Sequence, residues 1–215
     1  MRNGFQPKIK KIISLAEKLP YFTFDDLSPI EKNRHYLKIL FSRYEKNNQL
    51  IRLKKGLYVT KKYVDNLQKS GDFSSYLELL ANILSQPSYL SLDYVLYFHE
   101  LLTELPVNFT SITRNKTATF SNKLGNFVYH KIKSGLFSGF EMKRGGEFNI
   151  LRATKAKAFF DFLYLRKNLL ISKEAVSELR LNLKTFNKSD LKEFKKYLRL
   201  ENSKKMNEVF RYLFK

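Results

Sequence analysis

The chain has 215 residues and a mass of 25.5 kDa, which fits one large domain or two small ones, and its 43% apolar content is enough for ordered cores. Forty basic and twenty acidic side chains give a formal charge of +20, which destabilises a compact monomer unless a polyanion is its normal companion, so nucleic acid is the first expected partner. Because the chain has no cysteine, disulfide scaffolds, cysteine-based zinc fingers, iron–sulfur clusters and cysteine nucleophiles are excluded.

The hydropathy pattern bears on where the protein works. The first residues lack the sustained apolar stretch of a secretory signal, and no run of about 18 apolar residues could cross a bilayer. We therefore expect a soluble, cytoplasmic protein with no membrane partner.

The excess positive charge is unevenly distributed. Residues 1–62 carry 15 basic and 5 acidic side chains, and residues 63–113 carry 1 and 6. Residues 114–170 carry 12 basic and 3 acidic side chains, and residues 171–215 carry 12 basic and 6 acidic ones. An acidic block between basic ones indicates surfaces with different partners, and the first segment is the most basic.

The N-terminal pattern predicts three helices and a hairpin. A helix follows Pro7, and a short one opens near Thr23 and Asp26 and runs through Leu27. A longer helix is expected over 31–47, since Leu37, Leu40, Phe41 and Tyr44 repeat at helical spacing. Strands over 50–53 and 57–60 follow, with Lys54, Lys55 and Gly56 between them, and residues 61–72 are expected to be a linker.

Beyond this linker the pattern is mixed. Helical stripes are expected from Phe73 to Leu84 and after Ser91, which would cap its helix. Strands are expected over 107–113, 116–121 and 126–132, the last two forming a hairpin, and a second hairpin should turn at Gly145 and Gly146. An apolar helix around Phe159 and two or three C-terminal helices complete the chain.

The N-terminal order is that of a winged helix-turn-helix, with the third helix longest and a basic hairpin tip after it. If Leu37, Leu40 and Phe41 face the core, the outer face of the third helix carries the groups that read a major groove. Arginine suits guanine, asparagine suits adenine, and lysine suits phosphate or guanine; the candidates are Asn33, Arg34, His35, Lys38 and Ser42. Around the wing, the expected contacts to the DNA backbone or minor groove are Arg52, Lys54 and Lys55.

A resemblance to a known family begins in the N-terminal part, with Thr23-Phe24-Asp25-Asp26-Leu27, Tyr36 to Tyr44 and Gln49 to Val59. These segments resemble the AbiEi-type antitoxins of bacterial type IV toxin–antitoxin systems, which act in abortive infection. A more specific stretch runs from Pro87 to His99. It continues to about residue 166, through Thr110 to Thr119, then Phe127, Tyr129, Lys131, Ile132, Phe137, Gly139 and Phe140, and finally Ala153-Thr154-Lys155-Ala156-Lys157-Ala158 with Asp161 and Leu165.

This resemblance implies an antitoxin that represses its own operon by binding inverted repeats in the promoter. It also implies a second domain that opposes a cognate nucleotidyltransferase-like toxin, and whether the two proteins touch stays open. A regulator of similar architecture without a toxin partner and an RNA-binding protein are the alternatives.

No catalytic residues, metal or cofactor are expected. The three histidines, His35, His99 and His130, are far apart in sequence and lack acidic partners at ligand spacing. Glu141-Met142-Lys143 has the spacing of some nuclease sites but lacks an acid on a neighbouring strand candidate. The many aromatic residues are expected in cores rather than on single-stranded RNA, and the lysines of 192–199 on a solvated face or on nucleic acid rather than on a membrane.

We therefore predict an α+β protein that is not an enzyme. Residues 1–65 would form the winged helix-turn-helix, and residues 74–215 a domain of helices around a small antiparallel sheet. The predicted function of the protein is to bind operator DNA, repress transcription and oppose a toxin.

Overall fold

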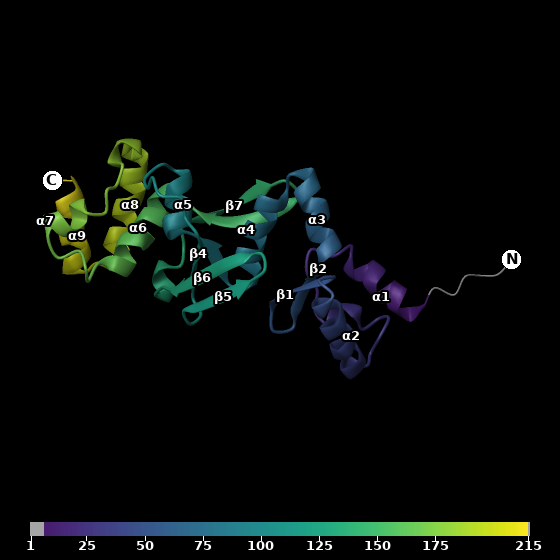
Figure 1. Cartoon of the computed structure of the whole chain (residues 1–215). Coiled ribbons are helices and arrows are strands. Elements are labelled where there is room, and N and C mark those ends of the chain that lie inside the picture. Colours follow the sequence, from purple (N-terminus) through teal and green to yellow (C-terminus); the bar gives the residue numbers. More distant parts are fainter. Residues whose placement is uncertain (1–6, 215) are drawn as a thin grey trace. The chain divides into compact units, whose positions relative to one another are not determined.

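A computed structural model describes residues 7–214 and confirms the α+β class (Figure 1). The chain divides into two compact units. Within the described residues, the first comprises residues 7–76 together with Phe120–Gly125, and the second comprises Leu77–Thr119 and residues 126–214.

The first unit is built from helices followed by a two-stranded hairpin. Its elements are α1 (Lys8–Ala16), the 3-10 turn η1 (Asp25–Leu27), α2 (Arg34–Lys46), β1 (Leu50–Lys54), β2 (Leu57–Thr60), α3 (Lys61–Ser70) and the start of α4 (Phe73–Ile83). One buried cluster joins α1, η1, α2 and the hairpin, and its members are Ile12, Ala16, Phe22, Leu27, Leu37, Leu40, Phe41, Leu50 and Tyr58. The three predicted helices and the hairpin are therefore present, although the second helix is a single 3-10 turn.

The hairpin has a third backbone partner that periodicity did not predict. Phe22, in the segment between α1 and η1, pairs antiparallel with Tyr58 of β2. The Phe22 N–H donates to the Tyr58 carbonyl at 2.8 Å, and the Tyr58 N–H donates back at 2.9 Å. This pairing fixes the chain between the first two helices against the hairpin.

The expected linker over residues 61–72 is wrong for most of its length, because Lys61–Ser70 form the helix α3. Thr60 caps this helix by accepting the Tyr63 N–H, and Gly71 ends it at a φ of +86°. Val64 and Leu67 are buried while the lysines face solvent. The segment is an amphipathic helix whose apolar stripe is only two residues long, so its lysines dominate the sequence pattern.

The second unit contains the six-stranded sheet, apart from the segment Phe120–Gly125, and the remaining helices. Its strands are β3 (Ser88–Leu90), β4 (Phe109–Thr113), β5 (Ala118–Asn122), β6 (Gly125–Lys131), β7 (Phe140–Gly145) and β8 (Phe148–Ala153). Its helices are α5 (Leu92–Phe98), η2 (Ser134–Leu136), α6 (Lys155–Arg166), α7 (Lys173–Ser177), η3 (Leu183–Thr185), α8 (Lys188–Glu201) and α9 (Lys204–Phe214). None of the helices within residues 7–214 is long and apolar enough to cross a bilayer.

The sheet is mixed, which corrects the expected antiparallel one. Its strand order is β5-β6-β4-β3-β8-β7, with β3 antiparallel to β4 and β7 antiparallel to β8. The pairs β4–β6 and β3–β8 are parallel. Both predicted hairpins form, but each adds its second strand to the centre of the sheet, and this lateral order creates the parallel pairs.

Helices cover both faces of the sheet. On one face, the α4 residue Asn82 exchanges hydrogen bonds with the backbone of Leu151, and the Tyr129 hydroxyl donates to the Ala81 carbonyl at 2.6 Å. Residue Thr110 of β4 faces the other side, where its hydroxyl donates to the Ser91 carbonyl and accepts the Tyr94 N–H at the start of α5. The central strands β3 and β4 lie between these helical layers and are buried on both sides, whereas most side chains of the outer strands β5 and β7 are half-buried or exposed.

Candidate nucleic-acid interface and a buried ionic network

Helix α2 separates apolar and polar side chains as predicted. Leu37, Leu40 and Phe41 are buried in the core of the first unit, and Tyr44 is half-buried. The exposed residues of the helix include His35, Lys38 and Ser42 away from this stripe and Arg34 at its edge. Arg34, Lys38 and Ser42 are four residues apart, so they follow one face of the helix. The structure thus brings together four of the five candidates predicted on this helix.

The fifth candidate, Asn33, is exposed but serves as the N-cap of α2. Its side-chain oxygen accepts the Tyr36 N–H at 3.0 Å, and its own N–H donates to the Glu31 carboxylate at 2.8 Å. Bidentate recognition of adenine uses both the oxygen and the nitrogen of the amide. The oxygen of Asn33 already has a partner, so the cap competes with a role in base recognition.

Arg34, the first residue of α2, forms an ion pair with Asp25 of η1. Both side chains are largely exposed, at 69% for Arg34 and 73% for Asp25. The adjacent Asp26 has a different role, because it accepts both the N–H and the hydroxyl of Thr23 at 2.7 Å. The sequence pattern gave no sign of the pair, since its partners are nine residues apart and lie in different elements.

The hairpin presents its basic residues unequally. Arg52 and Lys55 are exposed, whereas Lys54 is half-buried and its pKa is lowered by that burial. Gly56 adopts a φ of +79° at the turn, a conformation that favours glycine. Arg52 and Lys55 are therefore better exposed to a DNA backbone than Lys54.

Three further exposed residues of α2 were missed by the sequence interpretation. Ile39 is 42% exposed, and Arg43 and Lys46 lie in the last turn with exposed side chains. Arg43 could have been found from the pattern, because it lies one residue beyond Ser42 on the same polar side. Ile39 could not, since an isoleucine beside a core stripe usually extends that stripe.

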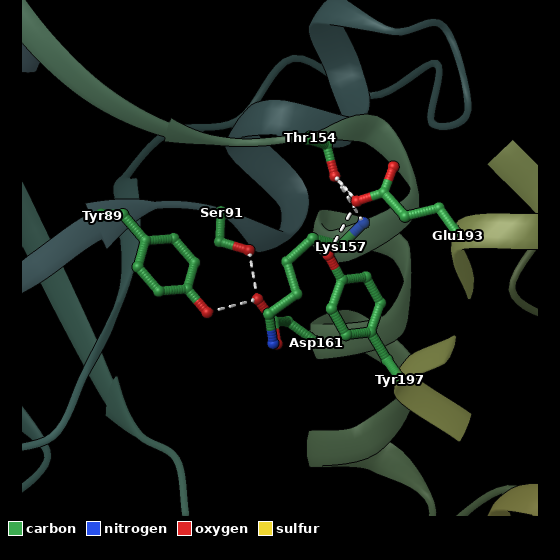
Figure 2. Close-up of polar contacts among 7 residues, drawn as sticks. All are labelled: Tyr89, Ser91, Thr154, Lys157, Asp161, Glu193 and Tyr197. Atoms are coloured by element: carbon green, nitrogen blue, oxygen red, sulfur yellow. Dashed lines mark hydrogen bonds and ion pairs between the residues drawn. The ribbon is translucent and has the colours of Figure 1, made fainter. Parts of the chain in front are cut away.

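The second unit holds a buried ionic network in its core (Figure 2). Lys157 and Asp161, one turn apart on α6, are both fully buried, and the Lys157 Nζ donates to Asp161 Oδ1 at 2.5 Å. The other oxygen of Asp161 accepts the hydroxyls of Tyr89 at 3.0 Å and Ser91 at 2.9 Å. The sequence predicted that Ser91 caps α5, but its side chain makes no capping hydrogen bond and binds Asp161 of α6 instead.

The same network reaches α8 on its other side. The hydroxyls of Thr154 and Tyr197 both donate to Glu193 Oε1 at 2.7 Å. The ammonium of Lys157 lies 5.1 Å from the ring centres of Phe160 and Tyr197, within range of cation–π attraction. Figure 2 shows Lys157 and Asp161 between Tyr89 and Ser91 on one side and Glu193 and Tyr197 on the other.

Burial opposes both charges of this ion pair. It lowers the pKa of Lys157 and raises the pKa of Asp161, while the attraction between the two charges opposes each shift. Neither side chain is accessible to a substrate, so the geometry indicates a structural role that ties β3, α6 and α8 together. The pattern that could have revealed it is a lysine and an aspartate four residues apart in a strongly apolar helix.

The residues considered for metal or nuclease chemistry do not converge. His35 is exposed, whereas His99 and His130 are half-buried, and burial lowers the pKa of both. The exposed Glu141 and Lys143 form an ion pair with each other at 2.6 Å. Within residues 7–214, no group of three His, Asp or Glu side chains could hold a metal ion.

Neither a scan against protein-family models nor a search of curated proteins finds a match to this chain.

Proposed function

We propose that this protein is a sequence-specific DNA-binding repressor whose first unit is a winged helix-turn-helix. The observation that carries the proposal is the exposed surface of α2 with Arg34, His35 and Lys38, beside a buried stripe that anchors the helix in the core. The element order supports it, because helices followed by a hairpin with basic side chains are the order expected of such a module, and the pairing of Phe22 with Tyr58 holds the segment before η1 against the hairpin.

In this proposal α2 enters the major groove. Arg34 recognises the O6 and N7 atoms of guanine, Lys38 contacts guanine or phosphate, and His35 and Ser42 contact bases or phosphates beside them. Arg52 and Lys55 hold the DNA backbone beside the hairpin, which positions the helix without reading sequence.

Fluorescence anisotropy tests the proposal, with the full chain titrated onto the duplex upstream of its own gene and onto a shuffled duplex at two salt concentrations. Tighter binding to the upstream duplex that persists at the higher salt is the expected result. Equal binding to both duplexes that vanishes with salt would contradict it. Competition by structured RNA would then decide for an RNA-binding protein, since an A-form major groove does not admit a helix.

Two substitutions assign the contacts. Arg34→Ala should weaken operator binding by about 1–3 kcal/mol and relax specificity at one base pair. Lys55→Ala should weaken operator and shuffled DNA alike and reduce the salt slope by about 1. Lys69→Ala, which removes an exposed charge from α3, is the matched control and should change neither property. Unchanged binding by both test variants would mean that another surface contacts DNA.

We further propose that the protein is the antitoxin of a type IV toxin–antitoxin pair, with the second unit opposing a nucleotidyltransferase-like toxin. The resemblance over residues 87–166 supports this role, and repression at inverted repeats in its own promoter would accompany it. Co-expression with the neighbouring gene tests it, because an antitoxin restores growth. Absence of toxicity, or toxicity without rescue, would leave a regulator with no toxin partner.

A further inference from the structure

The ion pair between Asp25 and Arg34 joins two elements whose relative position is fixed. Leu27 of η1 and Leu37 of α2 are both fully buried in the same cluster. Asp25 and Arg34 lie on the solvent side of these two elements and meet there. The contact is therefore set by the packing of the unit and not by a flexible loop.

Stability alone does not explain this pair. Ion pairs between exposed side chains contribute about 0–1 kcal/mol, and these side chains are 69% and 73% exposed. The carboxylate also places a negative charge on a surface proposed to approach phosphates, which lowers its attraction for any DNA. A residue that adds little stability and opposes general affinity at this position can have a different benefit, which is selectivity.

The geometry gives a way to produce that selectivity. A guanidinium is a planar fork with five N–H donors, and Asp25 accepts only from Nη2. Among residues 7–214, Asp25 is the one side-chain partner of the Arg34 guanidinium. The other N–H donors of Arg34 can therefore face a base edge. Holding the fork in one orientation before binding reduces the ordering entropy for a bidentate contact and disfavours contacts with wrongly placed acceptors.

We infer that Asp25 is a positioning residue that orients Arg34 toward a guanine and raises sequence selectivity at the expense of general DNA affinity. This inference rests on the proposed function, in which α2 reads DNA. The neighbouring Asp26 has a different contact, because its Oδ2 accepts two hydrogen bonds from Thr23.

The test compares Asp25→Asn with Glu45→Gln, which removes the same charge from α2 but leaves the ion pair intact. Anisotropy titrations on the operator and on the shuffled duplex are measured for the full-length variants. Asp25→Asn should bind the shuffled duplex more tightly and lower the operator-to-shuffled ratio by about 5-fold or more. Glu45→Gln should raise the affinity for both duplexes equally and leave the operator-to-shuffled ratio unchanged. If Asp25 had a purely structural role, Asp25→Asn would instead weaken binding to both duplexes in parallel and lower the melting temperature of the protein.

A second measurement shows whether Asp25 acts through Arg34. Each operator guanine is replaced in turn by 7-deazaguanine, which lacks the N7 acceptor. In the wild type one position should show the largest loss of affinity, and this loss should disappear in Arg34→Ala and shrink in Asp25→Asn. The double variant should be no less selective than Arg34→Ala alone.

The outcomes separate the two proposals. A wild type without operator preference refutes the proposed function and, with it, this inference. A wild type that prefers the operator, with an unchanged ratio in Asp25→Asn, refutes only the positioning role. The positioning role is also refuted if Asp25→Asn lowers the operator-to-shuffled ratio as much in the Arg34→Ala background as it does in the wild type.

Discussion

Replacing Asp161 by asparagine should destabilise the second unit strongly, because it removes one member of a fully buried ion pair. The amide keeps the volume of the side chain and an oxygen that can still accept the Tyr89 and Ser91 hydroxyls. It leaves the ammonium of Lys157, which has no exposed surface, without its negative partner. Breaking such a pair on one side costs about 3–5 kcal/mol.

This magnitude is large compared with the whole stability of a domain, which is about 5–15 kcal/mol. It corresponds to a fall in melting temperature of roughly 6–20 °C for a chain of this size. The matched control is Asp65→Asn, which breaks a lysine–aspartate pair of the same helical spacing that is 46% and 40% exposed. This control should change stability by less than about 1 kcal/mol.

The loss should also depend on pH in a defined direction. Without Asp161, burial depresses the pKa of Lys157 further, so the folded state binds fewer protons than the unfolded state. Stability then rises with pH from the depressed folded pKa up to the ordinary pKa of lysine. The deficit of Asp161→Asn should therefore shrink between neutral pH and pH 9.5 or so, where a typical lysine still holds its proton.

Urea denaturation followed by circular dichroism, at several pH values, measures these differences. Adding Lys157→Met to Asp161→Asn removes the orphaned charge and should recover part of the stability. A loss from Asp161→Asn no larger than that of Asp65→Asn would refute the reasoning, as would a deficit that grows with pH.

Two further substitutions test local geometry. Gly139→Ala should cost about 2 kcal/mol or more in thermal denaturation, because a Cβ there would lie 2.0 Å from the Tyr197 hydroxyl and the φ is +76°; Gly135→Ala, in open space, should be within about 0.5 kcal/mol of wild type. Asn33→Ala should lose the α2 cap and about 1 kcal/mol of unfolding free energy, whereas Asn33→Ser should retain the cap. If Asn33→Ser also retains operator affinity, Asn33 is only a cap, and if it loses affinity while remaining stable, Asn33 contacts a base.

Periodicity determined the elements whose apolar residues repeat strongly. The buried stripe of α2 and the hairpins at residues 122–125 and 145–146 could be predicted because each residue's neighbours in sequence dictate its local conformation. The same pattern predicted the exposure of Arg34, His35, Lys38 and Ser42, since polar residues outside a buried stripe remain solvated.

Only the tertiary structure decided how these elements combine. Local pattern does not state which strand of a hairpin joins the centre of a sheet, so the parallel pairs β4–β6 and β3–β8 could not be predicted. Nor does it show that a short, lysine-rich segment can bury Val64 and Leu67 and form α3. The Asp25–Arg34 pair and the contacts of Asp161 with β3 join residues from different elements. Such contacts depend on packing in three dimensions, which a one-dimensional pattern does not contain.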